Sequence, residues 1–301
     1  MTDTWTVRRV LGWTAQHFER KNIDSPRLTA EVLLAHTLAT SRVRLYTDLD
    51  RPLDSGELSR YRGFVERRTS GEPTQYLTGQ REFYGRPFQV DARVLIPRPE
   101  TELLVETVLQ RLPSTPLTVA DVCTGSGCIG VTLAAEREAW RVHATDLSKD
   151  ACLVAEANAK ALGVTPRFDV SCGDLLGPLP GDVLLDAVVS NPPYVASAEI
   201  DALSKEVRQE PRAALDGGVT GVILIERLAR EASRRLKPGG LLALEIGEHQ
   251  GAAVANLLTQ AGFADIAIEK DLAKLDRFAF GVATADAASA NAVLERPHGR
   301  D

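Results

Sequence analysis

Two hydrophobic patterns divide this chain. Through about the first 75 residues, apolar side chains recur three or four positions apart, as at Val7, Val10, Leu11 and Phe18, which is the spacing of an amphipathic helix. From Leu117 onward, short apolar runs alternate with helical stretches, which is typical of a parallel sheet covered by helices. The pattern predicts a small all-helical N-terminal domain followed by an α/β, doubly wound domain.

Capping residues mark two helix starts in the first segment. Ser25 precedes Pro26, the order expected of an N-cap and the first helical residue. Asp54 with Glu57 has the form of a capping box. The helix that begins there carries an arginine cluster, which consists of Arg60, Arg62, Arg67 and Arg68. The cluster is consistent with a solvated helix face or with a surface that docks a partner, and no chemistry is visible in this segment.

Short apolar pieces separated by turn residues join the two domains. Residues 83–90 and 94–96 are compatible with a β-hairpin linker, and the segment from Pro97 to Glu102 then begins a helix with an acidic first turn. We therefore predict a helical substrate-recognition domain over residues 1–75, a β-hairpin linker over 76–96, the α/β domain over 97–283 and a disordered tail over 284–301.

Seven apolar runs predict the strands of the α/β domain. Parallel strands are expected at residues 117–122, 142–145, 168–170, 186–189 and 239–245, and a closing antiparallel pair at 266–268 and 277–282. Together they would form a Rossmann-like, seven-stranded sheet. In such open sheets a ligand binds outside the carboxyl ends of the strands, where the strand order reverses.

Composition and charge restrict the partners. The net charge of −6 divides into +3 over residues 1–90 and −9 over residues 91–301, which weighs against a protein that grips a long nucleic-acid duplex. No apolar run is long enough for a membrane helix and the N-terminus has no secretory signal, so we expect a cytoplasmic protein. Cys123, Cys128, Cys152 and Cys172 form no CxxC pair, so we expect buried free thiols and no metal site.

The first predicted strand of the sheet runs into a glycine-rich turn. Gly125 and Gly127 let the backbone approach a ligand closely. The second strand ends at Asp146, 21 residues after Gly125, where a carboxylate can accept hydrogen bonds from both hydroxyls of a ribose. After the third strand, Asp174 is placed to meet an adenine amino group. These signals together predict a nucleoside cofactor.

The glycine pattern alone leaves two cofactor classes open. Gly125, Gly127 and Gly130 match the spacing of the dinucleotide fingerprint, which would indicate a nicotinamide dehydrogenase. Asp121 just before the turn gives the D-x-x-x-G-x-G form that is typical of S-adenosylmethionine binders.

The fourth predicted strand ends in the tetrapeptide Asn191-Pro192-Pro193-Tyr194. Each proline fixes its own φ and pushes the preceding residue into extended geometry, so Asn191 is held rigidly at the strand end. The Asn191 side-chain oxygen and the Pro192 carbonyl oxygen could accept both hydrogens of an NH2 group, with the Tyr194 ring packed on its plane. The plainer interpretations are a proline-terminated strand in a loop, or a non-catalytic scaffold.

These residues resemble the class I S-adenosylmethionine-dependent methyltransferases and, more closely, the HemK/PrmC family of peptide chain release factor glutamine methyltransferases. The resemblance is carried by the turn at residues 124–127, by the tetrapeptide, and by the segments at 71–79, 82–85, 95–102 and 210–215. The segment from Pro97 to Glu102 is more discriminating than the tetrapeptide, which adenine-N6 methylases share.

The resemblance implies a site. Contacts with S-adenosyl-L-methionine are implied for Cys123, Thr124, Gly125, Ser126, Gly127, Asp146, Asp174, Leu175 and Asn191. Substrate contacts are implied for Asn191, Pro192, Pro193 and Tyr194, of which Asn191, Pro192 and Tyr194 would be catalytic. The chain departs from many relatives at Cys123, where they have glycine, and at Leu175, where an aromatic residue often stands.

The resemblance also implies a reaction. The α/β domain would transfer a methyl group to the side-chain amide nitrogen, N5, of the glutamine in the Gly-Gly-Gln motif of release factors, which supports translation termination, and leave S-adenosyl-L-homocysteine. The helical domain would help hold that protein. We expect a monomer that does not bind nucleic acid directly. An adenine-N6 methyltransferase that acts on a flipped base of rRNA or DNA remains the alternative.

Overall fold

The protein, seen in a computed structural model that describes residues 4–285, divides into two compact units. The first unit comprises Met1–Gln80 together with Ser204–Gln209, and the second comprises Arg81–Leu203 and Glu210–Asp301. The domain boundaries predicted after residues 75 and 96 stay predictions, and the tail predicted over 284–301 lies almost wholly outside the described residues.

The first unit is helical, as predicted. Its main helices are α1 (Val7–Arg20), α2 (Pro26–Thr37), α3 (Arg42–Thr47), α4 (Ser55–Thr69) and α5 (Thr74–Thr78). Their apolar faces form one core around Leu11, Phe18 and Leu33, all fully buried. Burial of such faces, rather than helix propensity, supplies most of the stability of helices this short.

The two predicted helix starts behave differently. The capping box is confirmed, because the Asp54 carboxylate accepts from the Glu57 N–H at 2.7 Å and the Glu57 carboxylate accepts from the Asp54 N–H at 3.0 Å. Ser25 stands at the N-cap of α2 with Pro26 at the first helical position, but its side chain makes no capping hydrogen bond. Its left-handed backbone, with φ of 47°, replaces the extended geometry that a side-chain cap uses.

Two members of the arginine cluster are bound to acidic partners within the first unit. Arg67 holds Glu72 through two hydrogen bonds of 2.7 and 2.5 Å. Arg68 is buried and pairs at 2.5 Å with Glu206, which belongs to the Ser204–Gln209 segment. Arg68 therefore serves the packing of its own unit, and an exposed docking surface would have to use other members of the cluster.

The hairpin prediction is correct for one piece and wrong for the other. Strands β1 (Gln80–Phe83) and β2 (Arg86–Gln89) form a two-stranded sheet. The piece at residues 94–96 is not a strand. Its Ile96 N–H donates at 3.0 Å to the buried Glu210 carboxylate instead of to a neighbouring strand, so an apolar run here is buried without sheet pairing.

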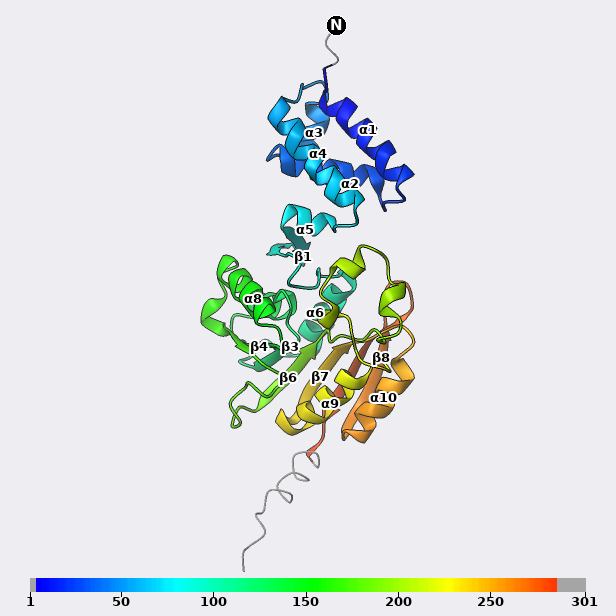
Figure 1. Ribbon diagram of the computed structural model, residues 1–301. Coiled ribbons are helices and arrows are strands. Elements are labelled where there is room, and N and C mark those ends of the chain that lie inside the picture. The colour runs from blue at the N-terminus through cyan, green and yellow to red at the C-terminus, as the bar shows by residue number, and fades with distance from the viewer. Residues whose placement is uncertain (1–3, 286–301) are drawn as a thin grey trace, which may run out of the picture. The chain divides into compact units, whose positions relative to one another are not determined.

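The second unit contains the predicted seven-stranded sheet, in the order β5-β4-β3-β6-β7-β9-β8 (Figure 1). The strands are β3 (Thr118–Val122), β4 (Arg141–Asp146), β5 (Phe168–Cys172), β6 (Leu185–Ser190), β7 (Leu236–Glu245), β8 (Phe263–Lys270) and β9 (Asp276–Ala283). The first five run parallel, and β9 is antiparallel to both β7 and β8. The chain order reverses between β3 and β6.

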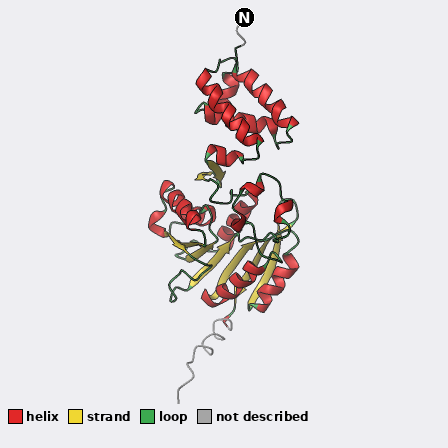
Figure 2. Ribbon diagram, viewed as in Figure 1, coloured by secondary structure: helices red, strands yellow, loops and turns green. Residues whose placement is uncertain are grey.

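Helices cover both faces of this sheet, as a doubly wound fold requires (Figure 2). They are α6 (Pro99–Arg111), α7 (Cys128–Glu136), α8 (Lys149–Ala161), α9 (Ile223–Arg235) and α10 (Gly251–Gln260). Short 3-10 turns of this unit lie at Thr165–Arg167, Ile200–Ala202 and Arg212–Ala214, and another, Val207–Gln209, belongs to the first unit. One core joins α6, α7 and α8 to one face, and a second joins α9 and α10 to the other. Alternate residues of β3 show this division, since Val119 belongs to the first core and Ala120 to the second.

Within residues 4–285, none of the helices combines the length and the apolar character that crossing a membrane demands.

Candidate active site

The glycine-rich turn after β3 has an alternating left-handed backbone. Cys123, Gly125 and Gly127 have φ values of 58°, 55° and 81°. The Thr124 N–H donates at 3.0 Å to the Thr145 carbonyl, which ties the turn to the end of β4. No heavy atom lies within 4 Å of the position that a Cβ on Gly125 would occupy. The turn therefore presents bare backbone to open space, as close approach of a ligand requires.

Asp121 lies buried under this turn. Its Oδ2 accepts from the Thr124 hydroxyl at 2.5 Å and from the Gly130 N–H at 2.9 Å. Burial raises the pKa of Asp121 to about 7. A Cβ on Gly130 would lie 2.7 Å from Phe168 and 2.8 Å from Asp121 Oδ2. The third glycine of the G-x-G-x-x-G spacing is thus required by packing inside the protein, whichever ligand binds outside.

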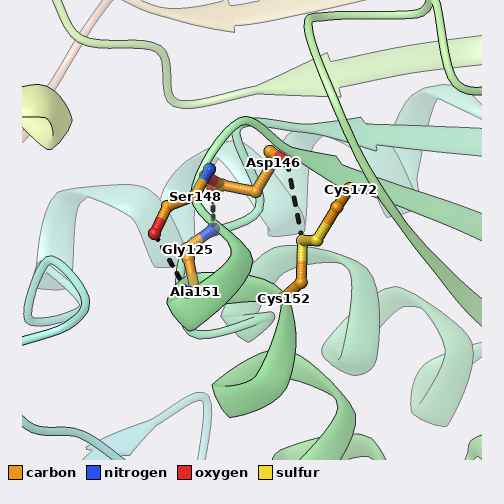
Figure 3. The surroundings of a disulfide bond; sticks show 6 residues. All are labelled: Gly125, Asp146, Ser148, Ala151, Cys152 and Cys172. Atoms are coloured by element: carbon orange, nitrogen blue, oxygen red, sulfur yellow. Dashed lines mark hydrogen bonds between the residues drawn. A yellow bond between two sulfur atoms is a disulfide. The ribbon is translucent and has the colours of Figure 1, made fainter.

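Asp146 is the last residue of β4 and faces the turn (Figure 3). Its Oδ2 accepts from the Gly125 N–H and its Oδ1 from the Ser148 N–H, both at 2.9 Å. Desolvation raises the pKa of this partly buried carboxyl group. Each carboxylate oxygen has a further lone pair available, so the group can still accept from two hydroxyls of a ribose.

The prediction of four free thiols is wrong for one pair. Cys152 on α8 and Cys172 at the end of β5 are joined in a disulfide close to Asp146 (Figure 3). The register of β4 and β5 places Asp146 opposite Cys172, and the first turn of α8 carries Cys152 back to the same edge. Cys123 and Cys128 are free, and burial raises the pKa of both thiols. A spacing of 20 residues gave no hint of the pairing, because only the tertiary fold brings the two ends together.

Asp174 and Leu175 follow β5 with unequal access to a ligand. The Asp174 carboxylate is half-exposed and forms an ion pair with Arg227 on α9. The Leu175 side chain is buried in the core that α9 and α10 cover, and its backbone is left-handed with φ of 47°. A ligand at this point would meet the Asp174 side chain and the backbone of Leu175, and the predicted cofactor contact of both stays a prediction.

The tetrapeptide leaves the sheet at the carboxyl end of β6. The buried Ser190 hydroxyl donates at 2.6 Å to the Val122 carbonyl, which joins the ends of β6 and β3. Asn191 and Tyr194 are partly exposed, and Pro192 and Pro193 are buried. The tetrapeptide and the glycine-rich turn therefore occupy neighbouring strand ends at the point where the strand order reverses, which is where open α/β sheets bind ligands.

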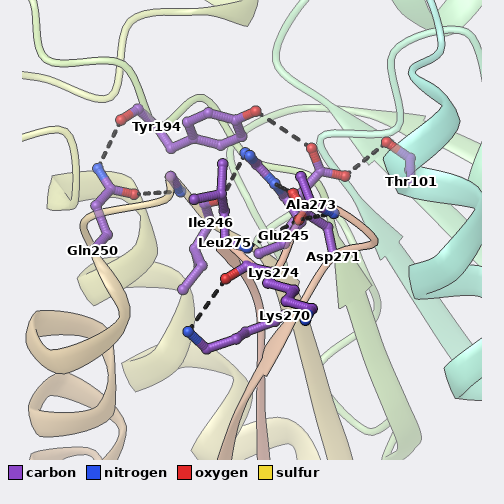
Figure 4. A network of polar contacts seen from close by, with 12 residues as sticks. Thr101, Tyr194, Glu245, Ile246, Gln250, Lys270, Asp271, Ala273, Lys274 and Leu275 are labelled. Carbon is purple, nitrogen blue, oxygen red and sulfur yellow. Dashed lines mark hydrogen bonds and ion pairs between the residues drawn. The ribbon is translucent and has the colours of Figure 1, made fainter.

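A buried acid next to the tetrapeptide was missing from the predicted site. Glu245, the last residue of β7, is 1% exposed. It accepts from the Thr101 hydroxyl at 2.7 Å and from the Tyr194 hydroxyl at 3.3 Å (Figure 4). Burial raises its pKa to about 7. The available signal was a charged residue at the end of the apolar run of residues 241–244.

Other supporting residues also went unpredicted. Gln250 donates at 2.8 Å to the Tyr194 carbonyl (Figure 4). Asn158, fully buried, donates to the carbonyls of Ser126 at 2.8 Å and Gln89 at 3.0 Å, which ties the turn to β2. Glu210 pairs with Arg98 at 2.5 Å, so two of the segments that carried the resemblance meet in space. His249, close to Glu245 in the sequence, has a largely exposed side chain.

These residues fit a nucleoside sulfonium and give no sign of a metal ion. The bare backbone at Gly125 and the two free acceptor positions of Asp146 match a ligand with a ribose and an amino-acid end. Over residues 4–285, no three His, Cys, Asp or Glu side chains lie close enough together to hold a metal.

Two family models match the chain over separate segments. Residues 9–79 match the model described as the PrmC N-terminal domain. Residues 99–225 match the model described as the methyltransferase small domain. The interval between the two matches, residues 80–98, contains the β1–β2 hairpin.

Curated relatives match over most of the chain. A release factor glutamine methyltransferase of Moorella thermoacetica is 45% identical over 85% of this chain and 91% of its own length. One of Chlorobaculum tepidum is 44% identical over 91% of this chain and 96% of its own length. A solved methyltransferase structure from Pyrococcus furiosus, 16% identical, covers 67% of this chain and 90% of its own with a TM-score of 0.51, which supports the fold alone.

Proposed function

This chain belongs to the release factor glutamine methyltransferase family, and from that premise we propose that it methylates N5 of the glutamine in the Gly-Gly-Gln motif of peptide chain release factors. The chain is a methyltransferase that acts on release factor glutamine, and S-adenosylmethionine is its methyl donor. S-adenosylhomocysteine is the second product. The modification supports translation termination.

One observation supports the site assignment most directly. The Asn191-Pro192-Pro193-Tyr194 tetrapeptide and the glycine-rich turn leave adjacent strands, β6 and β3, at the same edge. A donor held by residues 123–127 and Asp146, with Asp174 and Leu175 beside its adenine, would have its methyl group near Asn191. An acceptor amide held by the tetrapeptide would then meet that methyl group.

The chain's own residues position a weak nucleophile. A carboxamide nitrogen is unreactive because its lone pair is delocalised into the carbonyl. Asn191 Oδ1 and the Pro192 carbonyl would each accept one of its N–H groups and orient the lone pair, while the Tyr194 ring packs on the amide plane. S-adenosylmethionine supplies an electrophilic methyl group on its sulfonium. Fixing two reactants in reacting geometry can provide about 7–11 kcal/mol of the barrier reduction, so positioning can account for most of the rate.

No general base is assigned. The nitrogen gains the methyl group and loses one proton, and an N-methylated amide that still carries its extra proton is acidic enough to release it to water. His249 is therefore not needed, which agrees with its exposed side chain. We propose that Pro193 packs beneath the bound substrate amide, because it is buried and lies between Pro192 and Tyr194 in the chain.

The partner is a release factor. We propose that residues 1–75 help hold it, that residues 76–96 act as a linker, and that residues 97–283 perform the transfer. We propose further that the enzyme is a cytoplasmic monomer without direct nucleic-acid contacts. The net charge of −9 over residues 91–301 supports this, because binding a phosphate backbone requires a basic surface.

Asn191→Ala tests the assignment. Radiolabel transfer from S-adenosylmethionine to a release factor should fall at least about 100-fold, because the acceptor amide loses its orientation. The dissociation constant of the cofactor should change by less than about threefold, because the eight other implied cofactor contacts remain. Asn256→Ala, which removes an exposed asparagine on α10, is the matched control and should retain full transfer.

Two substrate controls complete the test. A release factor whose Gly-Gly-Gln glutamine is replaced by alanine should take no label. Labelled rRNA or DNA would instead support the adenine-N6 alternative. Wild-type turnover by the Asn191→Ala enzyme would refute the catalytic assignment.

A further inference from the structure

The buried Glu245 carboxylate is linked by hydrogen bonds to two side chains of the proposed substrate site, to Tyr194 directly and to Asn191 through Thr101. Its Oε2 accepts from the Thr101 hydroxyl at 2.7 Å, and its Oε1 accepts from the Tyr194 hydroxyl at 3.3 Å (Figure 4). Thr101, which is 1% exposed, lies in the first turn of α6 and also contacts Asn191, with 3.3 Å between Asn191 Nδ2 and Thr101 Oγ1. A continuous chain of hydrogen bonds thus runs from Glu245 through Thr101 to Asn191.

The direction of these hydrogen bonds follows from the chemistry of the groups. Above its pKa of about 7, the ionised Glu245 carboxylate only accepts, and a threonine hydroxyl has a single hydrogen to donate. When Thr101 donates that hydrogen to Glu245, its oxygen can only accept from Asn191. The nitrogen end of the Asn191 carboxamide must then face Thr101, and the oxygen end must face away from it.

The orientation of the Asn191 carboxamide matters because its two ends are nearly equal in size, but the oxygen accepts hydrogen bonds and the NH2 group donates them. An outward Asn191 oxygen accepts from the NH2 of a glutamine. An outward Asn191 nitrogen would instead offer a donor, which suits a carboxylate and leaves the glutamine NH2 facing another donor.

We propose that Glu245 and Thr101 are positioning residues that hold the Asn191 carboxamide with its oxygen toward the substrate, and that this orientation selects a glutamine amide over a glutamate carboxylate. The inference rests on the proposed role of Asn191 as a substrate ligand. The same carboxylate restrains Tyr194 through its second oxygen, so one buried acid restrains both polar side chains of the tetrapeptide, Asn191 through Thr101 and Tyr194 directly. Neither positioning residue needs to touch the substrate.

Thr101→Val is the central test because valine keeps the shape of threonine and removes the hydroxyl. Methyl transfer to a release factor should show kcat lowered by about 10- to 100-fold, the effect of one hydrogen bond to a buried charged group, with the cofactor dissociation constant unchanged. Thr101→Ser restores the hydroxyl and should recover kcat to within about threefold of wild type. Thr132→Val is the matched control, since Thr132 is also fully buried and its hydroxyl has no hydrogen-bond partner among the described residues.

Substrate discrimination separates positioning from a merely structural role. The readout is the ratio of dissociation constants for a release factor with its native Gly-Gly-Gln motif and one with glutamate in place of the glutamine. Wild type should favour glutamine, Thr101→Val should reduce that preference by about tenfold, and Thr101→Ser should restore it. Glu245→Gln, which can present a donor to Thr101 and so reverse the chain of hydrogen bonds, should shift the ratio in the same direction as Thr101→Val.

The outcomes distinguish the two proposals. If Asn191→Ala is inactive but Thr101→Val keeps wild-type kcat and discrimination, the positioning role is refuted and the site assignment stands. If Asn191→Ala itself is active, the proposed function of the tetrapeptide fails. Equal losses in Thr101→Val and Thr101→Ser, with an unchanged discrimination ratio, would indicate packing alone and also refute the positioning role.

Discussion

Gly130→Ala should destabilise the second unit although alanine is the better helix former. Gly130 lies inside α7, where replacing glycine by alanine ordinarily gains about 1 kcal/mol of helix stability. Here the new Cβ would lie 2.7 Å from a ring carbon of Phe168, 2.8 Å from Asp121 Oδ2 and 3.0 Å from Asp121 Cβ. Asp121 cannot yield freely because its carboxylate is held by the Thr124 hydroxyl and by the Gly130 N–H.

The magnitude of the change in unfolding free energy follows from two costs and one gain. Overpacking a buried site costs about 1–3 kcal/mol. Displacing the Asp121 carboxylate weakens a buried hydrogen bond to an acidic group, which is worth about 1.5–3 kcal/mol. After the gain of about 1 kcal/mol in helix propensity, we expect the free energy of unfolding of the second unit to fall by about 1.5–5 kcal/mol.

Urea unfolding followed by the fluorescence of Trp140 measures this change. Trp140 is 1% exposed and lies in the second unit, so a Trp5→Phe, Trp13→Phe background reports that unit alone. Gly63→Ala is the matched control, because Gly63 is also a helical glycine and no heavy atom lies within 4 Å of its added Cβ. Followed by circular dichroism, the control should gain up to about 1 kcal/mol. An unchanged or increased unfolding free energy for Gly130→Ala would refute the packing argument.

Two further predictions concern the buried acid and the disulfide. Because burial raises the pKa of Glu245 to about 7 from its ordinary 4.5, the folded state keeps a proton that the unfolded chain loses, so stability should fall as pH rises from about 4.5 to 7. Glu245→Gln should make this loss of stability smaller by about 3 kcal/mol, as measured by urea unfolding at pH 5 and pH 8. The similar contribution of Asp121 remains in both proteins. Identical pH profiles of the two proteins would contradict the prediction. Reducing the Cys152–Cys172 disulfide, whose cysteines are 20 residues apart, should lower the free energy of unfolding by about 3 kcal/mol. In denaturant, the unreduced protein should be alkylated only at Cys123 and Cys128. Alkylation of all four thiols would contradict the pairing.

The local pattern was sufficient for the sheet and for the edge where the proposed site lies. Alternating apolar strands and helices predicted all seven strands, because burying a strand on both faces requires a continuous apolar run. The segment at residues 94–96 has the same apolar character but no strand partner, and α9 at Ile223–Arg235 was not predicted at all. Whether residues 94–96 pair as a strand depends on what packs against them, which local sequence does not encode. For α9 the local signal was present, because its buried residues Ile225, Leu228, Ala229 and Ala232 recur at helical spacing.

The chain alone suggested the residues that are proposed to face the ligands, and the fold supplied the residues that hold them in place. Gly125, Asp146 and Asn191 were recognisable because a ligand imposes strong local demands on backbone freedom and hydrogen bonding. Glu245 and Thr101 are 144 positions apart in the chain and contact Tyr194 and Asn191 at separations of 51 and 90 positions. Asn158 binds backbone carbonyls 32 and 69 positions away, and the Cys152–Cys172 pair forms across a strand end. Such contacts carry no local periodicity, since any buried polar group is satisfied by whatever the tertiary fold brings within hydrogen-bonding distance.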